Sequence, residues 1–276
     1  MTRTFPAALA ACTLALTALA VAPAPAAAQT GFEGVITFQQ YNKSDGTHST
    51  MVQTSKGHKV RWDGMGSDNS TMILDGDSHT MIAVNNKEKS YVTITQADMD
   101  QMAAMMKPMA DRRKAQNKGD SDNKFKVDLA KTGRTETVAG TRCEVWHGTS
   151  TDDEGKKKEG EACVANGVGF EIYDLMLNNP MSKQMRGSMQ ESMEKYKQMM
   201  SGGKGLLKMT SIENGKSTVD MEATKIEKKS VGDDAFKPPA GYTGQSMGQM
   251  MQGAAQRLQM MKEKMQKSQG KPSDKN

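Results

Sequence analysis

Methionine is the residue type in this chain whose number and spacing could carry chemistry. It accounts for 25 of 276 residues, and most of these fall in three polar stretches. Because the steps are mainly three or four residues, each set should lie on one face of a helix. The sets are Met99, Met102, Met106 and Met109; Met181, Met185, Met189 and Met193; and Met247, Met250, Met251, Leu258, Met261 and Met265.

Three interpretations of these methionine faces are open. Flexible thioether side chains suit varied apolar molecules, so the faces could line a cavity for a lipid or an acylated protein. Soft sulfur could instead bind Cu(I) or Ag(I), although helical periodicity is explained by burial alone. The methionines could also merely pack helices onto a sheet. We favour the first interpretation and expect the ligand to contact Phe38, Trp62, Met102, Met106, Met185, Met189 and Met193.

Sequence motifs of catalysis and metal binding are absent. There is no H-E-x-x-H, no G-x-S-x-G and no glycine-rich phosphate loop. The four histidines are scattered, and Cys143 and His147 would lie about 13 Å apart along a strand, too far to share a metal. Acidic residues fall mainly in turns. We therefore predict neither an enzyme nor a metal or cofactor site.

Residues 1–28 have the pattern of a secretory signal peptide. Arg3 precedes an Ala-rich apolar run, and Ala26 to Ala28 form a small-residue cleavage site before Gln29. The segment ending in Cys12 resembles a lipoprotein acylation site, but few apolar residues precede it and an apolar run follows. The sequence thus predicts a periplasmic or secreted protein, cleaved after Ala28.

Two cysteines follow the predicted cleavage site, Cys143 and Cys163, both in strand-like segments. An even number of cysteines in an exported chain most simply forms disulfides, so we expect these two to pair across neighbouring strands. A thiolate metal or redox site is the alternative, but it lacks a C-x-x-C arrangement.

The net charge of +5 is modest, with basic runs at 156–158 and 262–271. A solvated loop and a flexible tail explain these runs better than nucleic-acid or anionic-lipid binding. We expect no nucleic-acid partner, while association with the envelope membrane stays open.

Period-two alternation and turn signals dominate residues 31–95, which predicts six strands in a meander. A Met-rich helix should begin at Gln96 and break near Lys107, because Pro108 cannot continue the hydrogen-bond ladder. Strands at 125–129, 132–138, 142–150 and 159–165 should follow, then a second Met-rich helical segment at 174–200. A hairpin, 206–211 and 217–227, turns at Asn214-Gly215. Pro238 to Tyr242 should end the sheet.

This order of elements predicts an α+β fold. We expect a strongly curved antiparallel half-barrel of ten or eleven strands, with Met-rich amphipathic helices over its concave face. Residues 29–242 should form one domain, and residues 243–276 a Met-bearing helix and a basic disordered tail. The concave face should include Phe38, Trp62 and Val92.

Several segments resemble the exported bacterial family known as domain of unknown function 4412. They are Gly31 to Phe38, Lys59 to Trp62, Thr132-Gly133, Val138 to Cys143, Lys225-Ile226 and Phe236 to Tyr242. That family resembles in fold the periplasmic lipoprotein-localisation carriers and receptors, whose part-open antiparallel barrels hold acyl chains under helices. The resemblance implies no particular site residues, and the Met-rich helices depart from the family pattern.

Overall fold

The computed structural model describes residues 31–43, 45–66, 69–116, 126–151, 155–169, 188–249 and 260. The predicted signal peptide and Cys12 lie outside these residues. So do Met185 and every member of the third methionine set except Met247. Of some helical residues, including Met106, Met189 and Met193, only the backbone is described.

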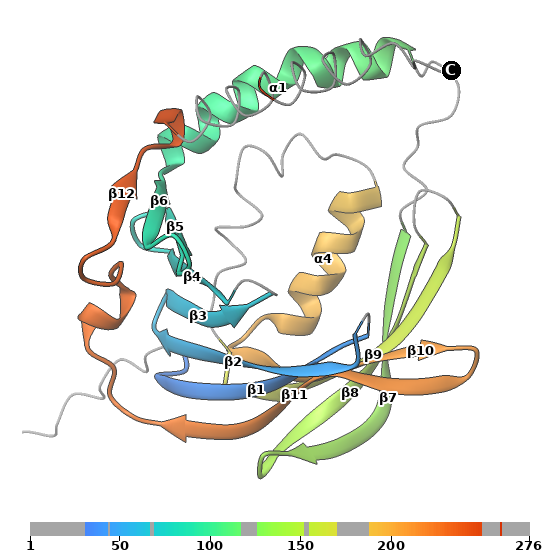
Figure 1. Cartoon of the computed structure of the whole chain (residues 1–276). Coiled ribbons are helices and arrows are strands. Elements are labelled where there is room, and N and C mark those ends of the chain that lie inside the picture. The colour runs from blue at the N-terminus through green and yellow to red at the C-terminus, as the bar shows by residue number, and fades with distance from the viewer. Residues whose placement is uncertain are drawn as a thin grey trace, which may run out of the picture.

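Twelve strands form one open sheet with the order β12-β6-β5-β4-β3-β2-β1-β11-β10-β9-β8-β7. Every neighbouring pair is antiparallel except β12 and β6. Figure 1 shows β3 to β6 rising on one side of β1, β2 and β11, and β7 to β9 rising on the other. The predicted open, mostly antiparallel sheet is confirmed. Its strands are β1 (Gly34–Asn42), β2 (Thr47–Lys56), β3 (Lys59–Met65), β4 (Ser70–Asp75), β5 (Thr80–Asn85), β6 (Ser90–Ile94), β7 (Lys126–Val138), β8 (Thr141–Thr151), β9 (Lys157–Asn166), β10 (Lys204–Glu213), β11 (Lys216–Lys228) and β12 (Thr243–Gln245).

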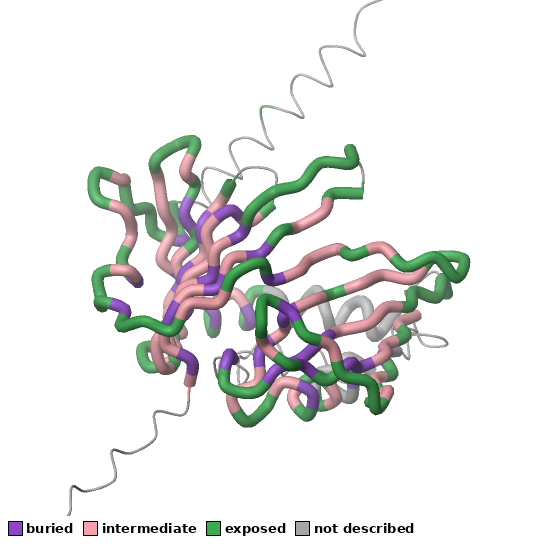
Figure 2. The backbone as a smooth tube through the Cα atoms, turned by 90° about the horizontal axis from the view of Figure 1, so that it is seen from below, coloured by how far each residue is buried: buried purple, intermediate pink, exposed green. Residues whose placement is uncertain are grey.

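The first six strands form the predicted meander, because alternating side chains give each strand one buried face. In β1, Gly34, Ile36 and Phe38 are buried and the intervening residues are partly exposed. Figure 2 shows buried residues gathered along the middle of the strands and exposed residues at the hairpin turns. The main buried cluster joins both halves of the sheet, since it contains Phe38 of β1, Val145 of β8 and Leu207 of β10.

The chain after β11 packs on β4 and adds a strand that the sequence did not predict. In the short 3₁₀ helix η1 (Asp233–Phe236), Phe236 is buried against Ile73 and Val231. The sheet does not end at Tyr242, because Thr243 donates its N–H to Lys89 O at 2.9 Å and β12 pairs parallel with β6. The prediction of ten or eleven strands was therefore wrong. Residues 243–245 are polar or glycine and exposed, so no alternation marked them.

Two predicted strands, 125–129 and 132–138, are one strand in the structure. β7 runs without interruption, and its register to β8 shifts between Lys131 and Thr135. Gly133 has a φ of 76° within this irregularity. A β-bulge absorbs extra residues while the strand continues, so a glycine inside a strand pattern marked a bulge here and not a turn.

Helix α1 (Gln96–Gln116) continues through Pro108, so the predicted break near Lys107 was wrong. Pro108 removes one intrahelical hydrogen bond, the one to the carbonyl of Ala104. Ala104 is exposed, so water can satisfy that carbonyl and the helix can continue. Within the described residues, no helix combines the length and hydropathy needed to cross a membrane.

A capping box fixes the start of α1. Asp98 N–H donates to the Thr95 hydroxyl at 3.2 Å, and the Asp98 carboxylate accepts from the Thr95 hydroxyl at 2.7 Å and from the Thr95 N–H at 2.9 Å. The hydroxyl, then the backbone N–H, lowers the pKa of Asp98 below its ordinary value. Helix α1 thus begins directly after β6, and its first turn buries Met99 against Ile94.

Candidate ligand-binding groove

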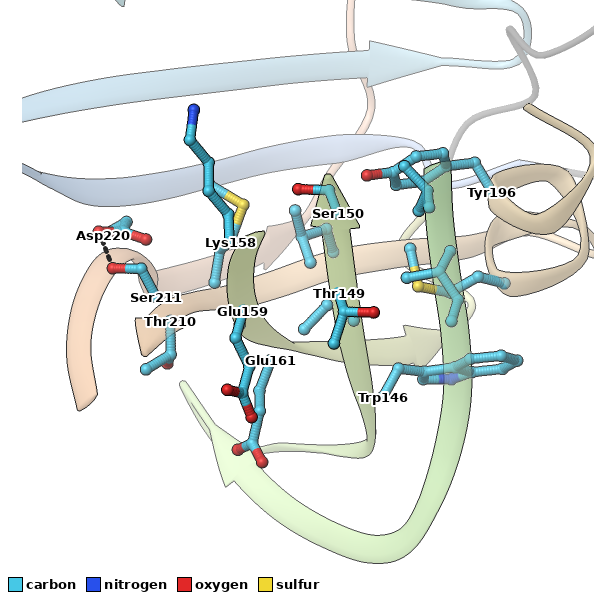
Figure 3. A pocket seen from close by; sticks show the side chains of 18 residues that line it. Trp146, Thr149, Ser150, Lys158, Glu159, Glu161, Tyr196, Thr210, Ser211 and Asp220 are labelled. Atoms are coloured by element: carbon cyan, nitrogen blue, oxygen red, sulfur yellow. Dashed lines mark hydrogen bonds between the residues drawn. The ribbon is translucent and has the colours of Figure 1, made fainter. Parts of the chain in front are cut away.

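A groove of about 260 Å³ lies between helix α4 (Ser188–Met200) and strands β7 to β10. We call it the α4 groove (Figure 3). Most of its wall is apolar, and polar side chains gather at one end. Its lining comprises Val127, Leu129, Trp146, Gly148, Thr149, Ser150, Lys158, Glu159, Gly160, Glu161, Ala162, Tyr196, Met199, Leu206, Met209, Thr210, Ser211 and Asp220.

The apolar wall is built around Trp146 of β8. Trp146 and Val164 are buried together with Met199, the α4 side chain that reaches the sheet. Leu129, Ala162 and Leu206 pack against this cluster and are partly buried. Residue Met209, which is 43% exposed, extends the wall beyond the cluster. The groove therefore offers aromatic, aliphatic and thioether surface along one continuous wall.

Helix α4 is attached to the sheet at two places. Lys195 Nζ donates to the carbonyl of Val127 at 3.1 Å and to the Asp128 carboxylate at 2.8 Å, which fixes the helix beside β7. The helix then ends at Gly202-Gly203, and Gly203 O accepts the N–H groups of Gly167 and Gly169. Gly203 has a φ of 70°, which glycine adopts without strain.

The groove lies on the same sheet face as Phe38. Residues directly opposite each other in an antiparallel pair share a face. Phe38 shares its side with Gln40, and the register runs from Gln40 to Met221, Met209, Ala162 and finally Trp146. The same reasoning places Trp62 and Val92 on that face, through Met51-Gln53 and Met72-Ala83.

The polar end of the groove carries carboxylates that are paired with cations. Glu161 pairs with Arg134, and Glu159 lies 3.3 Å from His147 Nε2. Asp220 accepts from the Ser211 hydroxyl at 2.9 Å and lies 3.4 Å from Lys43 Nζ. The Glu213 carboxylate, followed by Asp220, raises the pKa of Lys43 above its ordinary value. This end of the groove therefore combines both signs of charge.

The structure does not place the expected ligand residues in this groove. Phe38 is only 2% exposed and belongs to the main core, where it lies opposite Met51 and Ala223. Trp62 is half-buried, and its indole N–H donates to Gln53 Oε1 at 3.1 Å. Both therefore have a packing role, and their contact with a ligand stays a prediction.

The predicted methionines fall into different regions. Met102 packs beside Ile94, Met99 and Met247 at the start of α1. Met106 lies further along α1, and Met189 and Met193 lie in α4, but their side chains are outside the described residues, as is all of Met185. Among the described α4 methionines, Met199 and not a predicted one reaches the groove.

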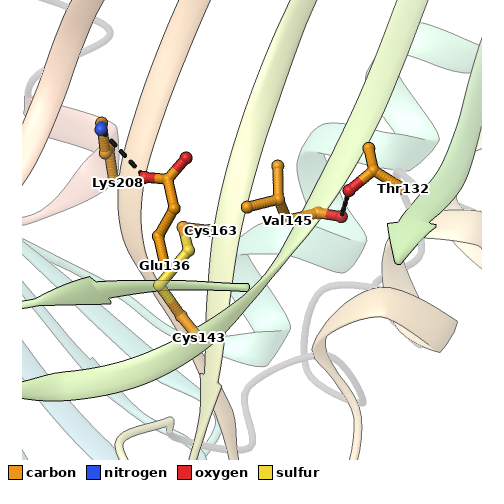
Figure 4. Close-up of a disulfide and its surroundings, with 6 residues drawn as sticks. All are labelled: Thr132, Glu136, Cys143, Val145, Cys163 and Lys208. Carbon is orange, nitrogen blue, oxygen red and sulfur yellow. Dashed lines mark hydrogen bonds and ion pairs between the residues drawn. A yellow bond between two sulfur atoms is a disulfide. The ribbon is translucent and has the colours of Figure 1, made fainter. Parts of the chain in front are cut away.

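The predicted disulfide between Cys143 and Cys163 is confirmed (Figure 4). The two Cα atoms are 5.4 Å apart on the neighbouring strands β8 and β9, and both residues are buried. Glu136 lies opposite Cys143 in β7 and pairs with Lys208 of β10 at 3.0 Å. The bond therefore reinforces the strands that form the floor of the groove.

The described residues contain no group of three or more His, Cys, Asp and Glu side chains that could hold a metal ion. Two thioether sulfurs do approach one side chain on the sheet. Gln40 Nε2 lies 3.4 Å from Met51 Sδ and 4.0 Å from Met221 Sδ. The amide N–H donates to these sulfurs, so the arrangement is explained as a part-buried hydrogen bond.

A family model described as a domain of unknown function (DUF4412) matches residues 32–242. The chain belongs to this family. The match spans most of the sheet and ends just before β12. In this DUF4412 chain, the closing Phe236 to Tyr242 segment has a structural role, because Phe236 is buried and the Tyr242 hydroxyl donates to Asn86 Oδ1 at 3.2 Å.

One solved structure is similar in outline, an uncharacterized conserved protein from Thermus thermophilus. It is 7% identical to this DUF4412 chain and gives a TM-score of 0.40, over 79% of this chain and 92% of that protein. No curated protein matches the chain significantly in sequence.

Sequence reasoning missed the groove because its lining comes from strands far apart in the chain. Trp146 lies next to the buried Val145 in a strand of alternating residues, so nothing local marked it as a ligand contact. The signal that could have found it is its type, since an indole on a strand with many polar neighbours is unusual surface for a solvated face.

Proposed function

We propose that this protein is a non-catalytic binding or carrier protein for an apolar ligand, such as a lipid or the acyl chain of an acylated protein. The observation that supports this most is the α4 groove, whose wall is mostly apolar and ends in a few polar side chains. Binding sites for small apolar molecules have this composition. Its volume of about 260 Å³ suits one chain or ring.

The proposal includes export and the arrangement of the helices. The signal-like residues 1–28 direct the chain to the periplasm or outside the cell, and the Cys143–Cys163 disulfide is compatible with an oxidising compartment. We propose that the Met-rich helices cover or gate the concave side of the sheet. Methionine suits this role because its flexible side chain adapts to ligands of different shape.

Native mass spectrometry of the protein purified from its own envelope tests the proposal. We expect an adduct that extraction with organic solvent removes and that chelators leave in place. The same spectrum reports the processed N-terminus and the disulfide. Protein that carries only copper or silver would favour the soft-metal interpretation, and protein that carries no apolar adduct would contradict the carrier proposal.

A substitution at the exposed part of the groove wall should weaken ligand binding selectively. Met209→Glu places a charge against the apolar wall, so the affinity for the fluorescent probe 1-N-phenylnaphthylamine should fall about tenfold or more. Met209 is 43% exposed, so the fold should tolerate the change. Val219→Glu is the matched control, because Val219 is 38% exposed on the neighbouring strand and does not line the groove. Equal loss in both variants would argue against binding in the groove.

A further inference from the structure

The indole N–H of Trp146 is buried and has no hydrogen-bond partner. It is the one buried side-chain nitrogen or oxygen in this state among the described residues. Trp146 is 9% exposed and lines the α4 groove. Figure 3 shows its ring on the α4 side of the groove, below Tyr196 and away from Glu161 and Asp220.

An unsatisfied buried donor is unfavourable, by about 1–3 kcal/mol. The chain satisfies its other indole, since Trp62 donates to Gln53 Oε1. Phenylalanine would give position 146 nearly the same apolar surface without the orphaned donor. A polar group that is left unpaired in an otherwise apolar pocket is the kind of group that fixes a ligand's orientation.

We infer that the ligand of the α4 groove is a neutral acyl ester or amide whose carbonyl oxygen accepts the Trp146 N–H. This inference rests on the proposed function and specifies the ligand class of the same site. The apolar wall takes the hydrocarbon chain, and the indole takes the one acceptor that distinguishes an acyl ligand from a plain hydrocarbon.

The charges at the polar end favour a neutral carbonyl over a free carboxylate. Glu159, Glu161 and Asp220 already place negative charge there. Two nearby cations, Arg134 and Lys43, are paired with Glu161 and Asp220. A ligand carboxylate would meet like charge at this end of the groove, whereas an ester or amide carbonyl needs only a donor.

Competition between two matched ligands tests the inference. Methyl dodecanoate and an alkane with the same number of non-hydrogen atoms should each displace 1-N-phenylnaphthylamine from the full-length protein. We expect the ester to bind about tenfold more tightly than the alkane, as one added hydrogen bond predicts. In Trp146→Phe the preference should disappear through weaker ester binding, with the alkane affinity unchanged. Trp62→Phe should keep the preference.

Fluorescence provides a second measurement that does not depend on the Trp146→Phe variant. The chain contains two tryptophans, so Trp146 is the only tryptophan emitter in Trp62→Phe. Its emission maximum should shift with the ester and stay unchanged with the alkane. Equal affinities for ester and alkane in the unmodified protein would overturn this inference while supporting an apolar site. Displacement by neither ligand would overturn the proposed function itself.

Discussion

Replacing Phe38 with alanine should lower the free energy of unfolding by about 3–5 kcal/mol. Phe38 is 2% exposed and belongs to the cluster that joins β1 to β8 and β10. Truncation removes a buried ring and leaves a cavity, because strands on both sides hold the surrounding backbone in place. Urea unfolding followed by circular dichroism measures the change.

Two comparisons make the result at Phe38 specific. Phe38→Leu should lose less than the alanine variant, because leucine fills part of the cavity. Val219→Ala, at an exposed position, should change the free energy of unfolding by no more than about 0.5 kcal/mol. If Phe38→Ala kept full stability but lost ligand binding, Phe38 would be a ligand contact, as the sequence suggested, and not a core residue.

Loss of the Cys143–Cys163 disulfide should lower the free energy of unfolding by about 3 kcal/mol. The bond joins residues separated by 20 positions, and in the chain-entropy description a loop of this length restricts the unfolded chain by about that amount. The double variant Cys143→Ala/Cys163→Ala should therefore unfold at lower urea concentration than the oxidised protein.

Reduction of the unmodified protein provides the control for this experiment. Dithiothreitol should shift the unmodified protein towards the stability of the double variant and leave the double variant unchanged. Both cysteines are buried, so reduction should need partial unfolding or time. Identical unfolding curves with and without the bond would show that the disulfide does not stabilise the native sheet.

Local patterns were enough to predict most strands. Alternation of buried and polar residues marked β1 to β6, and the turn at Asn214-Gly215 has φ values of 52° and 75°, as a primed hairpin turn requires. The disulfide followed from cysteine number and the predicted export. These features depend on residues close in sequence, or on a single pairing, so the sequence alone contains the information.

Features that depend on distant pairing could not be predicted in this way. Strand β12 exists because Thr243 meets the end of β6, and its three residues have no pattern of their own. Pro108 stayed helical because the carbonyl it leaves unpaired is exposed, which a propensity rule cannot know. The α4 groove required the register of β8 to β10 and the position of α4.

Methionine spacing was informative about helices but less so about the site. Met99 and Met199 are buried at the helix positions where each helix meets the sheet. Periodicity specifies which residues share a face, but not which part of that face meets a ligand. The groove methionines are Met199 at the end of α4 and Met209 in a strand, and a helical repeat predicts neither as a ligand contact.

The most direct test of the central claim is NMR of protein labelled with ¹³C at the methionine methyl groups, titrated with a spin-labelled acyl ester. The methionines then report the ligand position across the whole fold, with resonances assigned by single Met→Leu substitutions. If the ligand occupies the α4 groove, the strongest line broadening falls on Met199 and Met209, and the exposed Met105 of α1 is unaffected. Broadening confined to the α1 methionines, or broadening at none of these methyl groups, would contradict a ligand site in the α4 groove.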